Sequence, residues 1–184
     1  MDNTQRAFIY AFLSTVFSDK LSKKSIQDLK DNPDFLDLIG ENARKFFDDN
    51  DVETLDEELN IDFTSAFLAN SHPAESSIMD AKHQISTGLE NPVMNFYIGN
   101  GFDINLNNTN LLTPDHIAIE LGFMQNLTLG EDVQTQKEFM KKHILKWMAP
   151  YFLGAKTLVE TPFYLDFLDF ATEFLLSDYE SLSV

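Results

Sequence analysis

The stretch 113-TPDHIAIELGFM-124 carries the clearest fold signal in the sequence. Thr113 can cap a helix, Pro114 suits the first helical position, and Asp115 favours the positive end of the helix dipole. An apolar stripe at helical spacing follows, formed by Ile117, Leu121 and Met124. The stretch therefore predicts a helix that is capped at Thr113.

Helical spacing of apolar residues extends to both sides of this stretch. It predicts a helix of about 15 residues at the N-terminus, capped by Asp2, Asn3 or Thr4. Further helices are predicted over 22–29, 33–47, 76–88 and 132–148, around Phe63 to Phe67, and from Thr161-Pro162 to near the C-terminus. Strand alternation and internal repeats are not found, so the sequence predicts an all-α fold.

The segment 91–112 breaks the helical pattern. It contains Pro92, Gly99, Gly101 and several Asn residues, and it is longer than the usual connection between helices. We expect a functional loop or hinge here. It would divide a single helical domain, residues 1–184, into an N-terminal lobe of about 1–90 and a C-terminal lobe of about 113–184.

The composition is strongly acidic, with 30 Asp and Glu against 13 Lys and Arg and a net charge of -17. Such a field repels nucleic acids and anionic membranes and attracts cationic peptides or protein patches. Acidity that only maintains solubility is the simpler interpretation. The acidic run 48–62 also has two interpretations: it is either a solvated face or the rim of a binding groove.

Several classes of chemistry are absent from the sequence. Without Cys there is no disulfide, thiolate metal site or Cys nucleophile, and the common phosphate-loop and hydrolase motifs are missing. We expect no catalytic residues and no cofactor. Since no signal-peptide pattern or bilayer-spanning apolar run is present, we expect a cytoplasmic protein without stable membrane insertion.

His116 and Glu120 lie four residues apart on the predicted helix. This spacing allows a metal site with His143 or Asp115, a structural His–Glu pair, or a polar cluster that receives a ligand. We favour the structural pair over the metal and expect no bound metal. His143 and Trp147 are also four apart, next to Phe139, which is typical of an aromatic core stripe.

These residues carry a family resemblance. Pro114-Asp115-His116 running into Glu120-Leu121-Gly122-Phe123-Met124 resembles the TorD/DmsD family of cytoplasmic chaperones for molybdenum-containing redox enzymes. The spacing of Phe139, His143 and Trp147 is also similar to that family, as is, more weakly, the segment 62–76. The resemblance covers most of the chain. The sequence departs from the family pattern at Ala74 and Ile78, where aromatics are common, and at 111–113, where Glu is common.

The resemblance implies an all-helical chaperone without catalytic turnover. Such a protein binds the twin-arginine signal peptide and the body of a molybdenum-containing reductase or dehydrogenase, and delays its export until the molybdopterin cofactor is inserted. Carboxylates would hold the guanidinium groups and aromatic residues the apolar part of the peptide. The signal-peptide-binding candidates are Asp115, His116, Glu120, Phe63, Phe67, Pro73, Glu75, Ser76 and Phe123.

Possible clients include trimethylamine N-oxide reductase, dimethyl sulfoxide reductase and formate dehydrogenase. The chain would be a monomer or a dimer that exchanges lobes through the 91–112 segment. One alternative is an acidic helical adaptor that binds a basic folded partner without reading a signal peptide. Another is a metal-binding helical protein.

Overall fold

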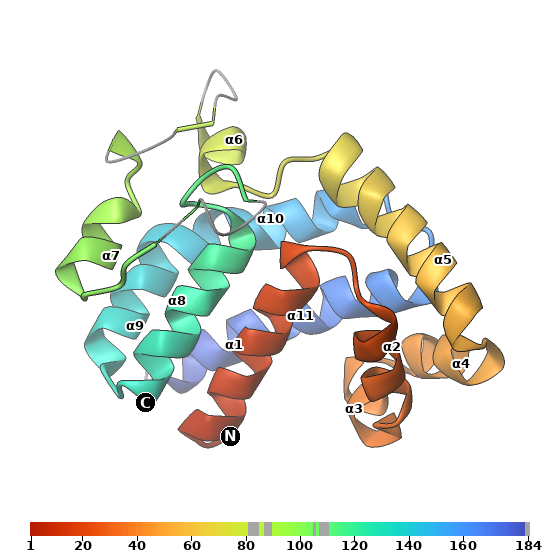
Figure 1. The fold of residues 1–184 in the computed structure, drawn as a ribbon. Coiled ribbons are helices and arrows are strands. Elements are labelled where there is room, and N and C mark those ends of the chain that lie inside the picture. The colour runs from red at the N-terminus through yellow and green to blue at the C-terminus, as the bar shows by residue number, and fades with distance from the viewer. Residues whose placement is uncertain (81–84, 87–89, 105, 107–110, 183–184) are drawn as a thin grey trace. The chain divides into compact units, whose positions relative to one another are not determined.

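The computed structural model describes residues 1–80, 85–86, 90–104, 106 and 111–182. Within these residues all regular structure is helical, and the only β feature is an isolated bridge between Ala74 and His116 (Figure 1). The predicted all-α fold is confirmed. None of the described helices has the length and apolar character needed to cross a membrane.

In chain order, the helices of the described residues are α1 (Asn3–Ser18), α2 (Lys23–Lys30), α3 (Pro33–Ile39), α4 (Glu41–Asp49), α5 (Val52–Phe63), η1 (Thr64–Ala69), α6 (Glu75–Met79), α7 (Met94–Gly99), α8 (Ile117–Leu129), α9 (Val133–Phe139), η4 (Met140–Ile144), α10 (Leu145–Ala155) and α11 (Pro162–Ser181). The two η elements are π-helical turns that continue α5 and α9 without a break.

Contacts divide the chain into two compact units. Unit 1 comprises Met1–Asp19, Pro73–Ala149 and Leu175–Val184, and unit 2 comprises Lys20–His72 and Pro150–Phe174. Each unit therefore combines segments from both sides of the predicted 91–112 hinge. The two lobes predicted from the sequence are thus different from these units. They remain a prediction about which parts of the chain two copies could exchange in a dimer.

In unit 1, α1 and α8 pack along each other (Figure 1). Asp2 caps α1 by accepting a 2.8 Å hydrogen bond from the Gln5 N–H, as the sequence predicts. Further along α1, the Ser14 hydroxyl donates to the Ala118 carbonyl at 2.7 Å. This bond joins α1 to the first turn of α8.

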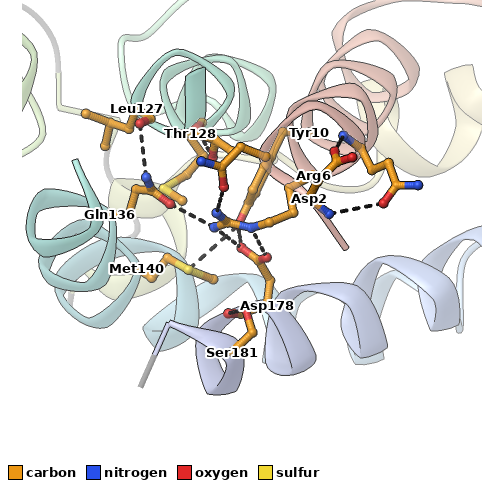
Figure 2. Close-up of polar contacts among 12 residues, drawn as sticks. Asp2, Arg6, Tyr10, Leu127, Thr128, Gln136, Met140, Asp178 and Ser181 are labelled. Atoms are coloured by element: carbon orange, nitrogen blue, oxygen red, sulfur yellow. Dashed lines mark hydrogen bonds and ion pairs between the residues drawn. The ribbon is translucent and has the colours of Figure 1, made fainter. Parts of the chain in front are cut away.

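A buried ion pair ties the two ends of the chain together in unit 1. The Arg6 guanidinium donates to both carboxylate oxygens of Asp178 at 2.5 and 3.0 Å, and to Gln136 Oε1 at 2.7 Å (Figure 2). The Tyr10 hydroxyl adds a 2.7 Å bond to Asp178. Burial and the neighbouring Asp178 charge raise the pKa of Tyr10, so its hydroxyl stays a donor.

In unit 2, the prediction of one helix over 33–47 is wrong. The chain forms α3 and α4, which meet at Gly40. The carboxylate of Asp166 lies where a side chain on Gly40 would be, and it accepts a 2.8 Å hydrogen bond from the Ala43 N–H. Asp166 thus supplies the N-terminal cap that α4 lacks locally, and this tertiary contact decides the break.

Other predicted boundaries also need correction. The segment 91–112 contains α7, because Val93, Phe96 and Tyr97 bring apolar contacts that outweigh the turn-forming residues around them. The helix that contains Pro150 runs on to Ala155, and α6 ends at Met79. The rest of the predicted 76–88 helix falls partly outside the described residues.

Candidate functional site

Two short segments of unit 1, residues 73–75 and 115–117, lie side by side and form the framework of the site. The Ile117 N–H donates to the Pro73 carbonyl at 2.8 Å, and the Glu75 N–H donates to the Asp115 carbonyl at 3.0 Å. Residues 114 and 115 form a turn, and the pairing holds His116 in an extended conformation. For this reason α8 starts at Ile117, and the prediction that Thr113 caps it is wrong.

Asp115 is almost completely buried, with 1% of its surface exposed. One carboxylate oxygen accepts a 2.7 Å hydrogen bond from the Ser76 N–H, and the other accepts one from the Thr113 hydroxyl. The Ser76 hydroxyl in turn accepts a 3.0 Å bond from the Ser86 N–H. Asp115 therefore holds the first turn of α6, and both of its oxygens are already occupied.

His116 is the N-terminal cap of α8. Its Nδ1 accepts a 3.2 Å hydrogen bond from the Ala118 N–H, which requires an unprotonated Nδ1. Burial lowers the pKa of His116 to about 4, although the nearby Asp115 charge acts in the opposite direction. His116 is accordingly neutral at pH 7, and its imidazole has a structural role at the helix start.

Glu75 and His143 form a contact between α6 and η4. Glu75 Oε2 lies 2.7 Å from His143 Nδ1, and the two side chains retain 14% and 7% exposure. The His143 ring also packs edge-on against Phe96, with 5.2 Å between ring centroids. Glu75 is the most exposed of the three carboxylates in this region, and it is therefore the one that a ligand can reach first.

Glu120 lies deeper, with no exposed surface. Its Oε2 accepts a 3.1 Å hydrogen bond from the Trp147 indole, whereas its Oε1 has no hydrogen-bond partner among the described residues. Burial raises the pKa of Glu120 well above its usual value. The charges of Glu75 and Asp115 raise it further, against the effect of the Trp147 bond. Three carboxyl groups thus influence one another in a small volume.

Aromatic rings pack beside these carboxyl groups. Phe123 lies 4.8 Å from both Tyr97 and Phe139 and 5.1 Å from Phe102, measured between centroids. The Tyr97 hydroxyl donates to the Pro114 carbonyl at 3.1 Å. Sequence reasoning missed Phe96, Tyr97 and Phe102. The adjacent Phe96-Tyr97 pair within 91–112 was the available signal.

The predicted site residues therefore fall into two groups. Seven of them belong to unit 1: Pro73, Glu75, Ser76, Asp115, His116, Glu120 and Phe123. Phe63 and Phe67 belong to unit 2, where both are buried and pack against Tyr164 at 6.4 and 5.5 Å.

The four suggested metal ligands each have different partners. His116 bonds to the backbone, Glu120 to Trp147, His143 to Glu75, and Asp115 to Thr113 and the Ser76 N–H. Across the described part of the chain, no group of three or more His, Asp or Glu side chains has a geometry that could hold a metal ion. The arrangement is that of a polar network with one accessible carboxylate.

Two comparisons with known proteins, one with family models and one with individual proteins, point to the same protein family. A family model described as "Nitrate reductase delta subunit" matches residues 31–152. The chaperone protein TorD of Aliivibrio salmonicida (strain LFI1238) is 27% identical, over 82% of this chain and 81% of that protein. No solved structure matches the chain significantly.

Proposed function

The chain belongs to the TorD/DmsD family, whose members are chaperones that bind molybdoenzyme precursors and are not enzymes, and from this we propose that it binds a twin-arginine signal peptide. The client is the apo form of a molybdopterin-containing reductase or dehydrogenase. Binding assists insertion of the cofactor and delays export of the client. The chaperone acts in the cytoplasm, where such precursors are made.

The observation that carries this proposal is the carboxylate network around Glu75. A guanidinium group prefers a carboxylate that can accept two parallel hydrogen bonds. Glu75 is partly exposed and has only His143 as a side-chain partner within hydrogen-bonding distance among the described residues. An incoming arginine can replace the imidazole, because it offers a full charge and more donors. Asp115 and Glu120 contribute by position: one anchors the turn that carries Glu75, and the other lies behind it.

The apolar part of the peptide has a neighbouring surface. Ile78 and Met79 are 37% and 51% exposed and lie three and four residues after Glu75 on the same helix, α6. A peptide whose arginines lie at Glu75 can place its apolar residues along this face. The rings of Phe123 and Tyr97 are buried and pack against each other, so they belong to the core beside the site and do not contact a ligand directly.

The proposal can be tested by co-expressing the chain with a molybdoenzyme precursor. Three versions of the client are compared: the native leader, a leader with Lys-Lys in place of the arginine pair, and no leader. We expect co-purification to be strongest with the native leader. Equal recovery of all three, with binding that falls steeply as salt increases, would instead support the acidic adaptor.

A further inference from the structure

Four lysines concentrate on one short part of this acidic protein. The segment Lys137 to Lys146 contains Lys137, Lys141, Lys142 and Lys146, which are four of the 13 basic residues of the chain. Glu138 is the only acidic residue in the segment, so its formal charge is +3 (four minus one) in a chain of -17. Such a local reversal of charge is not needed for solubility.

The lysines line a hollow in unit 1 of about 700 Å³, together with Gln134, Glu138 and Tyr179. They come from α9, η4 and α10, which form a continuous run of helix. The π-helical turn η4 places an extra residue in the run. Lys141 and Lys146 lie five residues apart, which is the spacing of the hydrogen bonds in a π-helix. The irregular turn thus allows all four lysines to line the same hollow.

Most of this positive charge is not neutralised. Lys142 pairs with Glu138 and also lies over the Phe96 ring, 5.3 Å from its centroid. For Lys137, Lys141 and Lys146, no carboxylate of the described residues lies within 4.0 Å. Three ammonium groups therefore remain available to a ligand.

We propose that this hollow binds an extended acidic segment of a partner protein. Nine residues of helix separate the first lysine from the last, roughly 13 Å along the axis, so several carboxylates in an extended chain match them better than one compact anion. The lining has no arginine to clamp a phosphate. Because the lysines lie in a hollow, a flat membrane surface would not reach them all, and the net charge of -17 opposes a long nucleic acid.

This proposal goes beyond the proposed function. The hollow recognises negative charge, whereas the Glu75 network recognises positive charge, and His143 points into the core while Lys141 and Lys142 on the same turn are exposed. The two sites are therefore separable by mutation. A partner with a basic leader and an acidic surface segment would engage both.

The test uses the full-length chain and a fluorescent 12-residue peptide with six Glu, with a matched peptide in which Gln replaces each Glu. Anisotropy titrations are run on the wild type and on the triple variant Lys137→Gln, Lys141→Gln, Lys146→Gln. The control triple variant Lys23→Gln, Lys24→Gln, Lys45→Gln loses the same charge from exposed positions in unit 2. Circular dichroism verifies that both variants fold.

We expect the Glu peptide to bind the wild type and the control variant alike, and the hollow variant to bind about tenfold more weakly. The Gln peptide should not bind, and the hollow variant should keep wild-type affinity for a twin-arginine peptide. Equal weakening in both triple variants, or no binding of the Glu peptide, would overturn the proposal. So would displacement of the peptide by micromolar tripolyphosphate or stronger binding to phosphatidylserine vesicles, since either would assign the lysines to another ligand.

Discussion

Glu120 accepts a hydrogen bond from the Trp147 indole at 3.1 Å through one oxygen, while its other oxygen is buried without a partner in the described part of the chain. This geometry favours a neutral carboxyl group, because a buried charge with one hydrogen bond is costly. Glu75 and Asp115 strengthen the effect through their negative charges. Glu120 therefore acts as a neutral support behind the proposed peptide site.

The raised pKa of Glu120 predicts how stability depends on pH. The folded state holds the proton more tightly than the unfolded state, so the free energy of unfolding falls as pH rises above about 4.5, the ordinary value. Glu120→Gln keeps an acceptor for Trp147 and removes this loss. Urea unfolding at pH 5, 7 and 8 should show a flatter profile for the variant and equal or greater stability at pH 8. A variant profile parallel to the wild type would argue against a neutral Glu120.

His116 predicts an opposite dependence at lower pH. Its pKa of about 4 in the folded state lies below the usual 6.5, so the unfolded state binds more protons between these values. Stability contributed by neutral His116 is complete above pH 6.5 and is lost as pH falls toward 4. His116→Asn keeps a capping acceptor without a titrating group and should reduce this loss. His116→Ala should cost about 1 kcal/mol at pH 7 through the lost cap. Equal acid sensitivity of the Asn variant and the wild type would contradict this role.

The Arg6–Asp178 pair predicts a large coupling energy in unfolding experiments. Asp178→Leu leaves the Arg6 guanidinium buried with Gln136 and Asn3 as its side-chain partners among the described residues, and should cost about 3–5 kcal/mol. Replacing both residues, as in Arg6→Met with Asp178→Leu, removes the charges together and should cost much less than the sum of the two single changes. Strict additivity in this double-mutant cycle would show that the pair is not coupled.

Gly40 and Gly154 provide a matched pair of substitutions. A methyl group on Gly40 would overlap the Asp166 carboxylate that caps α4, so Gly40→Ala should destabilise by about 1–3 kcal/mol. Gly154 lies within α10 with no atom near the added methyl group, and Gly154→Ala should stabilise by about 0.5–1 kcal/mol. Thermal unfolding distinguishes the two. A neutral effect at Gly40 would mean that the Asp166 cap is dispensable.

Local sequence signals predicted the helices that carry their own caps. Asp2, one of the three predicted caps, caps α1, and Ser22, the first residue of the predicted 22–29 helix, caps α2. In both cases the side chain accepts from the N–H three residues on, so the cap is local. The break at Gly40 and the late start of α8 at Ile117 could not be predicted in this way. Both depend on contacts from distant segments, namely Asp166 in one case and Pro73 in the other.

The same distinction applies to the candidate site. Family-like motifs identified Asp115, His116 and Glu75, and in the structure these residues lie where α6 is joined to the start of α8. The pairing of Glu75 with His143 links residues 68 positions apart and has no local signature. Phe63 and Phe67 were selected as apolar groove residues, but helical spacing alone cannot separate a groove from the core of unit 2 in which they lie.

The most direct test of the account is a calorimetric titration of the chain with a twin-arginine leader peptide and with its Lys-Lys version. We predict that the wild type prefers the arginine peptide, and that Glu75→Gln weakens its binding about tenfold and removes most of the preference. The control Glu53→Gln removes the same charge from an exposed position in unit 2 and should bind like the wild type. Equal affinity of the wild type for both peptides, or equal behaviour of the two variants, would contradict recognition of the arginine pair at Glu75.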